Sequence, residues 1–92
     1  MKYELIPKYI GRKSFYGKAI VDQIEYLGNK LYTLFSYNTK VAQVLVRKDK
    51  TEYYYYGKFS STTSCHQKEF FKQFDLNDVE IQELFKNKTL SK

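Results

Sequence analysis

The sequence predicts an α+β fold, in which a four-stranded antiparallel meander is followed by two short C-terminal helices packed on one face. Strand-like runs separated by turns of two or three residues fill positions 14–59, and such short connections exclude parallel crossovers. After Phe59 a hydroxyl cluster leads into apolar residues at helical spacing. Because 92 residues provide one core, we expect a single domain over residues 1–92, with an irregular segment at 1–13, the sheet at 14–59 and the helices at 61–88.

Four runs rich in β-branched and aromatic residues are predicted to be the strands. They are Ile24–Leu27, Lys30–Tyr37, Lys40–Arg47 and Thr51–Phe59. Gly28-Asn29 is a natural two-residue hairpin turn between the first two runs. Asn38-Thr39 and Lys48–Lys50 separate the others. Pro7 breaks any earlier strand, so the N-terminal segment is expected to be irregular.

The first helix is predicted to start within the hydroxyl cluster Ser60–Ser64, which offers several N-caps. Ser64 with Gln67 fits a capping box. Phenylalanines at positions 70, 71 and 74 then form the apolar stripe of a short amphipathic helix.

The second helix is predicted from another capping box, Asn77 with Glu80, followed by apolar residues at helical spacing. The pattern fades by Lys88, so we expect residues 89–92 to be frayed.

The tyrosine run in the last strand predicts an exposed aromatic face. Along Thr51–Phe59 the side chains alternate, so Tyr53 and Tyr55 point one way while Tyr54 and Tyr56 point the other. Two short helices cover one face of a sheet and leave the other uncovered. Unless the N-terminal segment or a second copy of the chain covers that face, it indicates a partner.

The basic residues and tyrosines concentrate in the first two thirds of the chain. The net charge is +6, residues 1–18 hold five basic residues against Glu4 alone, and all ten tyrosines lie at or before Tyr56. This distribution favours an anionic partner such as nucleic acid. The alternative is a composition inherited from an AT-rich genome, which also enriches Lys, Tyr, Asn, Ile and Phe.

No catalytic or metal-binding pattern is present, so we expect no enzyme activity, no cofactor and no metal. Cys65 and His66 are helix neighbours that project about 100° apart, and His66 is the single histidine. Gly11–Lys18 differs from a phosphate-binding loop, because five residues separate its glycines and Ala19 follows the lysine.

The lone Cys65, the lack of a signal peptide pattern and the short apolar runs predict a cytoplasmic protein with no membrane partner.

Candidate binding residues come from the basic segments, the turns, the tyrosine run and the hydroxyl cluster. Backbone N–H groups at a helix start favour an anion, with capping as the simpler reading of that cluster. Tyrosines provide stacking platforms for unpaired bases, the alternative being core or interface packing. The candidates are Arg12, Lys13, Lys18, Tyr37, Asn38, Thr39, Arg47, Tyr54, Tyr56, Thr62, Thr63 and His66.

Three spaced motifs carry a resemblance to a known family: Arg12–Ala19, Ser36–Ala42, and Ser61–Ser64 with His66. Together they resemble a family of short uncharacterised proteins encoded by phages, prophages and plasmids of low-GC bacteria. In that family an arginine often precedes the histidine, where this chain has Cys65. The resemblance implies an accessory protein of a mobile element. It also suggests that the three motifs converge on one patch.

The leading functional hypothesis is a non-enzymatic phage-type accessory protein that binds an anionic partner through its basic, tyrosine-bearing half. That partner is nucleic acid or a host nucleoprotein, for example a CRISPR effector inhibited as a counter-defence. One alternative is sequestration of a small nucleotide signal near Thr62–His66. Another is a homo-oligomeric structural protein, such as a homodimer formed through the aromatic sheet face.

Overall fold

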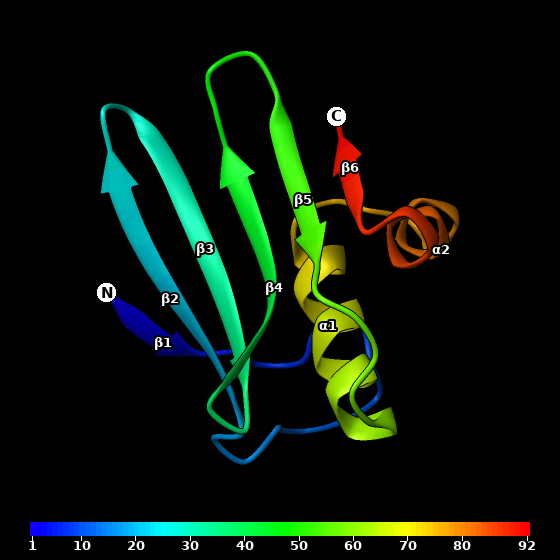
Figure 1. The fold of residues 1–92 in the computed structure, drawn as a ribbon. Coiled ribbons are helices and arrows are strands. Elements are labelled where there is room, and N and C mark those ends of the chain that lie inside the picture. The colour runs from blue at the N-terminus through cyan, green and yellow to red at the C-terminus, as the bar shows by residue number, and fades with distance from the viewer.

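The computed structural model describes residues 1–92 as a six-stranded antiparallel sheet and two helices (Figure 1). The strands lie side by side in chain order, from β1 at one edge to β6 at the other. The expected α+β class is confirmed, but the sheet has two more strands than predicted. The elements are β1 (Lys2–Glu4), β2 (Ala19–Tyr26), β3 (Asn29–Ser36), β4 (Thr39–Val46), β5 (Thr51–Tyr55), α1 (Ser61–Gln73), α2 (Asp78–Asn87) and β6 (Thr89–Ser91).

The two tight hairpin turns lie one residue earlier than predicted. Leu27 and Gly28 connect β2 to β3 with φ values of 52° and 83°, and Tyr37 and Asn38 connect β3 to β4 with 51° and 67°. Two successive positive φ values match the turn geometry that follows the right-handed twist of a hairpin. Asn29 therefore pairs with Tyr26 as a strand residue.

Both edge strands were missed by the sequence analysis. β1 lies inside the segment that was expected to be irregular, and it pairs with β2. β6 lies among the residues that were expected to be frayed, and it pairs with β5. Three residues are too few to show an alternating pattern. Lys88 ends α2 in the left-handed conformation, with φ of 70°, and its carbonyl accepts a hydrogen bond from Tyr55 N at 2.9 Å. This contact directs the chain back along β5.

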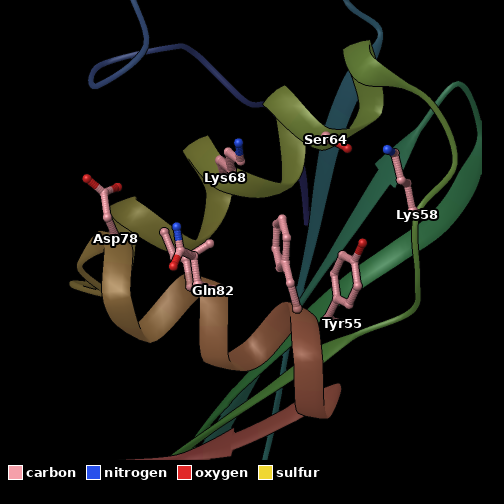
Figure 2. A pocket seen from close by; sticks show the side chains of 8 residues that line it. Tyr55, Lys58, Ser64, Lys68, Asp78 and Gln82 are labelled. Atoms are coloured by element: carbon pink, nitrogen blue, oxygen red, sulfur yellow. The ribbon is translucent and has the colours of Figure 1, made fainter.

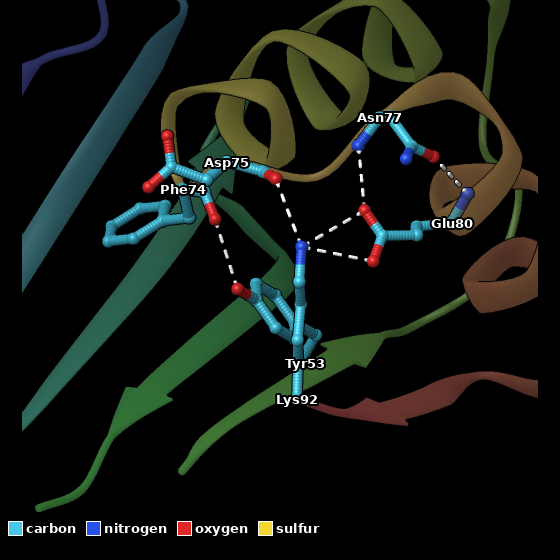
Figure 3. A network of polar contacts seen from close by, with 6 residues as sticks. All are labelled: Tyr53, Phe74, Asp75, Asn77, Glu80 and Lys92. Carbon is cyan, nitrogen blue, oxygen red and sulfur yellow. Dashed lines mark hydrogen bonds and ion pairs between the residues drawn. The ribbon is translucent and has the colours of Figure 1, made fainter.

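The C-terminal residue ties β6 to the start of α2 (Figure 3). Lys92 Nζ donates to the backbone oxygen of Asp75 at 3.3 Å and lies 3.0 Å from a Glu80 carboxylate oxygen. Glu80 also completes the predicted capping box, because Asn77 N donates to its carboxylate at 3.0 Å and Glu80 N donates to Asn77 Oδ1 at 2.8 Å. Beside this network, Tyr53 Oη donates to the carbonyl of Phe74 at 3.0 Å.

The start of α1 corrects a predicted cap. Ser60 is the N-cap, and its hydroxyl accepts from Thr63 N at 3.1 Å, so the helix begins before the expected Ser64–Gln67 box. Gln67 is fully buried, and its amide donates to the carbonyls of Val41 and Gly57 at 3.0 and 3.1 Å. It therefore anchors the helix to the sheet instead of capping it.

Both helices pack on one face of the sheet, and the core fills the space between the helices and the sheet. The expected alternation of the tyrosine run is confirmed, since Tyr53 and Tyr55 are buried in this core while Tyr54 and Tyr56 point to the opposite face. That opposite face, here called the outer face, has no covering helix. Its apolar residues are half-buried or exposed: Ile20, Ile24, Leu31, Phe35 and Leu45.

A buried carboxylate fastens the segment between β1 and β2 to α1. Glu69 is fully buried, and its Oε1 accepts from the amides of Tyr9 and Ile10, each at 2.9 Å. Gln73 donates to Glu69 Oε2 at 2.6 Å and to the carbonyl of Ile6 at 2.8 Å. Burial alone raises the pKa of Glu69, but the hydrogen bonds it accepts prevail and hold that pKa below its usual value.

Replacement of this carboxylate is expected to destabilise the fold. Glu69→Ala leaves the partly buried amides of Tyr9 and Ile10 unpaired, which lowers the free energy of unfolding by roughly 2–3 kcal/mol in chemical denaturation. Glu83→Ala is the matched control, because Glu83 is exposed on α2 and forms no ion pair. Equal losses for the two variants would contradict the anchoring role.

The difference between Glu69→Ala and the parent chain is expected to depend on pH. A carboxyl whose pKa is lowered on folding stabilises fully above its unfolded value, which is about 4.3. That stabilisation is lost as the pH falls through the lower folded value. Denaturation curves should therefore differ most near neutrality and converge in acid.

Candidate binding site at the basic end of the sheet

Unpaired basic residues gather at the end of the sheet that carries the β3–β4 turn. We call Arg12, Lys13, Lys18 and Lys40 the basic end. All four are exposed, and none forms an ion pair. The turn and the segment before β2 meet here, because Tyr37 N donates to the carbonyl of Lys18 at 2.9 Å. In Figure 1 this end is at the bottom, opposite the β2–β3 and β4–β5 turns.

Glu4, an acidic residue that contacts the loop before Lys18, is already engaged in hydrogen bonds. Glu4 in β1 accepts from Gly17 N at 3.1 Å and from Ser14 Oγ at 3.5 Å. Its carboxylate thus fixes the loop that leads to Lys18, and it forms no ion pair with the basic end. The result is a local excess of positive charge that favours an anion.

A buried polar cluster supports the basic end from beneath. Ser36 Oγ lies 2.9 Å from Thr63 Oγ1 and 2.8 Å from His66 Nδ1, and all three side chains are buried. The Phe15 ring meets the His66 ring edge-on, with centroids 4.5 Å apart. The three sequence motifs therefore converge around His66.

The surroundings of His66 disfavour its charged form. Burial lowers its pKa, and the nearby charge of Arg12 lowers it further. Its hydrogen bond goes to a serine that is itself buried, and no carboxylate orients the ring. The hydrogen bond joins two buried side chains, so it connects the end of β3 to α1 within the fold. The structure also contains no cluster of three His, Cys, Asp or Glu side chains that would hold a metal ion.

The basic end continues onto the outer face through Lys40. Lys40 Nζ lies 5.2 Å from the centroid of the Tyr56 ring, a cation–π distance, and Tyr56 Oη donates to Gln43 Oε1. Lys40 is also the cross-strand partner of Phe35. Next to this pair is an open hollow of about 510 Å³ lined by Lys2, Ile20, Phe35 and Asn38. Positive charge and aromatic surface are therefore contiguous.

The structure places the candidate binding residues in three groups, with Arg47 separate from all of them. Arg12, Lys13 and Lys18 belong to the basic end, and the turn residues Tyr37, Asn38 and Thr39 lie beside it. Tyr54 and Tyr56 are on the outer face. Thr63 and His66 are buried under the turn and Thr62 is half-buried beside them, so the hydroxyl motif is largely used within the fold.

Arg47 does not join this site. It lies at the opposite end of the sheet, where Nε is 3.0 Å from a Glu52 carboxylate oxygen. Three residues that do line the site were missed, namely Lys2, Phe35 and Lys40. The pairing of Phe35 with Lys40 was readable in principle from the β3–β4 hairpin, whereas the position of Lys2 depends on the unpredicted β1.

The model of a protein family described as a family of unknown function, DUF8033, matches residues 2–87. This agrees with the expected membership of an uncharacterised family. No curated protein and no solved structure matches the chain significantly. Neither helix has the length and apolarity needed to cross a membrane.

The electrostatic contact between Arg12 and His66 is testable by titration. Arg12→Gln removes a positive neighbour, so the pKa of His66 is expected to rise towards its ordinary value. Because the chain has a single histidine, its ring resonances can be followed by NMR without ambiguity. Lys48→Gln, at the opposite end of the sheet, removes the same charge and should leave the pKa unchanged. If the pKa of His66 is the same in Arg12→Gln as in the parent chain, the charge of Arg12 does not act on His66.

Proposed function

Because the chain belongs to this family of unknown function, we propose its function from geometry: it is a non-enzymatic protein that binds single-stranded nucleic acid. The surface is the basic end together with the adjoining part of the outer face. The observation that carries the proposal is an uncovered sheet face with Phe35, Tyr54 and Tyr56, on which unpaired Lys40 lies next to Phe35 and Tyr56.

The outward rings are suited to stacking with unpaired bases. Tyr56 is 41% exposed and is held by Gln43 and Lys40, so its orientation is set before a ligand arrives. Tyr54 Oη donates to Glu52 at 3.3 Å, and Glu52 is itself held by Arg47. A pre-positioned ring loses little conformational freedom on binding. Each base stacked on an aromatic side chain contributes roughly 1–3 kcal/mol.

The basic end supplies phosphate contacts. Arg12, Lys13, Lys18 and Lys40 are exposed and free of carboxylate partners, so their charges are available to a polyanion. A duplex hides the faces of its bases, and the helices that would enter a major groove are packed on the other side of this sheet. Both considerations favour a single strand.

The resemblance to proteins of mobile elements extends this proposal to a host nucleoprotein. In that version the same surface engages exposed guide or target nucleic acid of a defence complex, such as a CRISPR effector, and inhibits it. A second copy of the chain is the competing occupant of the outer face, because Ile24, Leu31 and Leu45 line a small apolar hollow there. Light scattering of the protein with and without a nucleic acid strand distinguishes the two, since a dimer formed through this face would dissociate when the strand binds.

Phosphate contacts are tested by fluorescence anisotropy with labelled single-stranded DNA and RNA at several salt concentrations. For the double variant Lys18→Gln, Lys40→Gln, we expect weaker binding and a log–log salt slope smaller by about 1.4, given ~0.7 per phosphate on single strands. The double variant Lys30→Gln, Lys48→Gln removes the same charge at the far end of the sheet and should retain most of the affinity. Equal effects of both double variants would place the strand elsewhere or reduce binding to net charge.

Stacking is tested by removing one ring. Tyr56→Leu keeps an apolar side chain but abolishes stacking, and it should weaken single-strand binding by roughly fivefold or more while leaving the salt slope unchanged. Tyr26→Leu is the control, because Tyr26 is an exposed tyrosine on the same face at the far end of β2. If Tyr56→Leu binds single strands with the affinity of the parent chain, Tyr56 does not stack with a base.

A further inference from the structure

A second pocket lies between α1 and α2, on the opposite side of the sheet from the outer face (Figure 2). Its volume is about 460 Å³, within the range of roughly 300–1,000 Å³ that small-molecule sites occupy. The residues that concern its chemistry are Tyr55, Lys58, Ser64, Lys68, Gln82 and Phe85.

One wall of this pocket is aromatic. The rings of Tyr55, from the end of β5, and Phe85, from α2, are stacked with centroids 4.2 Å apart and planes inclined by 15°. The buried side chain of Ile81 extends the same wall. Such a surface favours a ligand with a planar, apolar part.

The opposite rim is made of hydrogen-bond donors. Ser64 and Lys68 are four residues apart and therefore share a face of α1. Lys58 reaches the same rim from the chain segment that follows β5, and in Figure 2 the Ser64 side chain lies between the two lysines. Neither lysine forms an ion pair or a hydrogen bond within the chain.

The charge inside the pocket is positive. Asp78 is the one carboxylate among the lining residues, and its Oδ1 lies 3.0 Å from Lys72 Nζ, which balances it. Lys58 and Lys68 therefore line the pocket without a carboxylate partner. Two ammonium groups beside a hydroxyl can hold a phosphate through several charge-assisted hydrogen bonds.

We propose that this pocket binds a mononucleotide. Its phosphate lies between Lys58 and Lys68 and accepts from Ser64 Oγ, and its base lies against the Tyr55–Phe85 wall. An inorganic phosphate would leave the aromatic wall unused, and a neutral aromatic molecule would leave the two lysines unpaired. The site is separate from the single-strand surface, which uses the other face of the sheet, so the two proposals stand or fall independently.

The test is an NMR titration of the ¹⁵N-labelled protein with AMP, GMP, CMP and UMP, with adenosine and inorganic phosphate as the two halves of AMP. We expect saturable shifts at Ser64, Lys68 and Gln82 with at least one mononucleotide, and weaker binding of each half. The double variant Lys58→Gln, Lys68→Gln should weaken that binding by about tenfold or more. Lys30→Gln, Lys48→Gln and Tyr56→Leu should leave it unchanged.

Two results would overturn the assignment. One is the absence of saturable shifts at these residues with all four mononucleotides at millimolar concentration. The other is an equal loss of affinity in the pocket double variant and the Lys30→Gln, Lys48→Gln control, which would reduce the binding to net charge. Neither outcome bears on single-strand binding by the outer face, because Lys58 and Lys68 do not belong to that surface.

Discussion

The rest of the structure depends on the fact that two helices, of 13 and 10 residues, can cover only one of the two faces of this sheet. The fully buried Phe70 and Phe71 of α1 commit that helix to the inner face, and Ile81 and Leu84 commit α2 to the same layer. Apolar burial of this kind is the main favourable term in folding. The outer face is consequently left to solvent or to a partner, and the proposed single-strand surface follows from that asymmetry.

The parts of the fold that follow from local rules were predictable. The hairpins, the outward direction of Tyr54 and Tyr56, and the Asn77–Glu80 box each depend on residues close together in the sequence. The missed features depend on distant contacts. β6 exists because α2 returns the chain to β5, and the burial of Glu69 reflects amides some 60 positions away. No local sequence pattern indicates that β6 pairs with β5 or that Glu69 binds these amides.

The candidate site was partly predictable for the same reason. Arg12, Lys13 and Lys18 stood out as a basic segment, but Lys40 becomes part of the site only through its cross-strand partner Phe35 and its position over Tyr56. The hydroxyl motif shows the opposite error. Thr63 and His66 have the chemistry of an anion site, yet each is paired with Ser36 within the core. Buried polar groups need partners, and here the chain provides them.

The short edge strands have a consequence for self-association. An exposed strand edge is a template for pairing with another chain, and proteins protect such edges with very short strands and charged residues. Here β1 and β6 each have three residues, and β1 carries Lys2 and Glu4. Addition of a foreign strand to β1 or β6 would therefore gain few backbone hydrogen bonds. Neither edge strand is thus a long template for the stacking of further chains, while one broad face stays open.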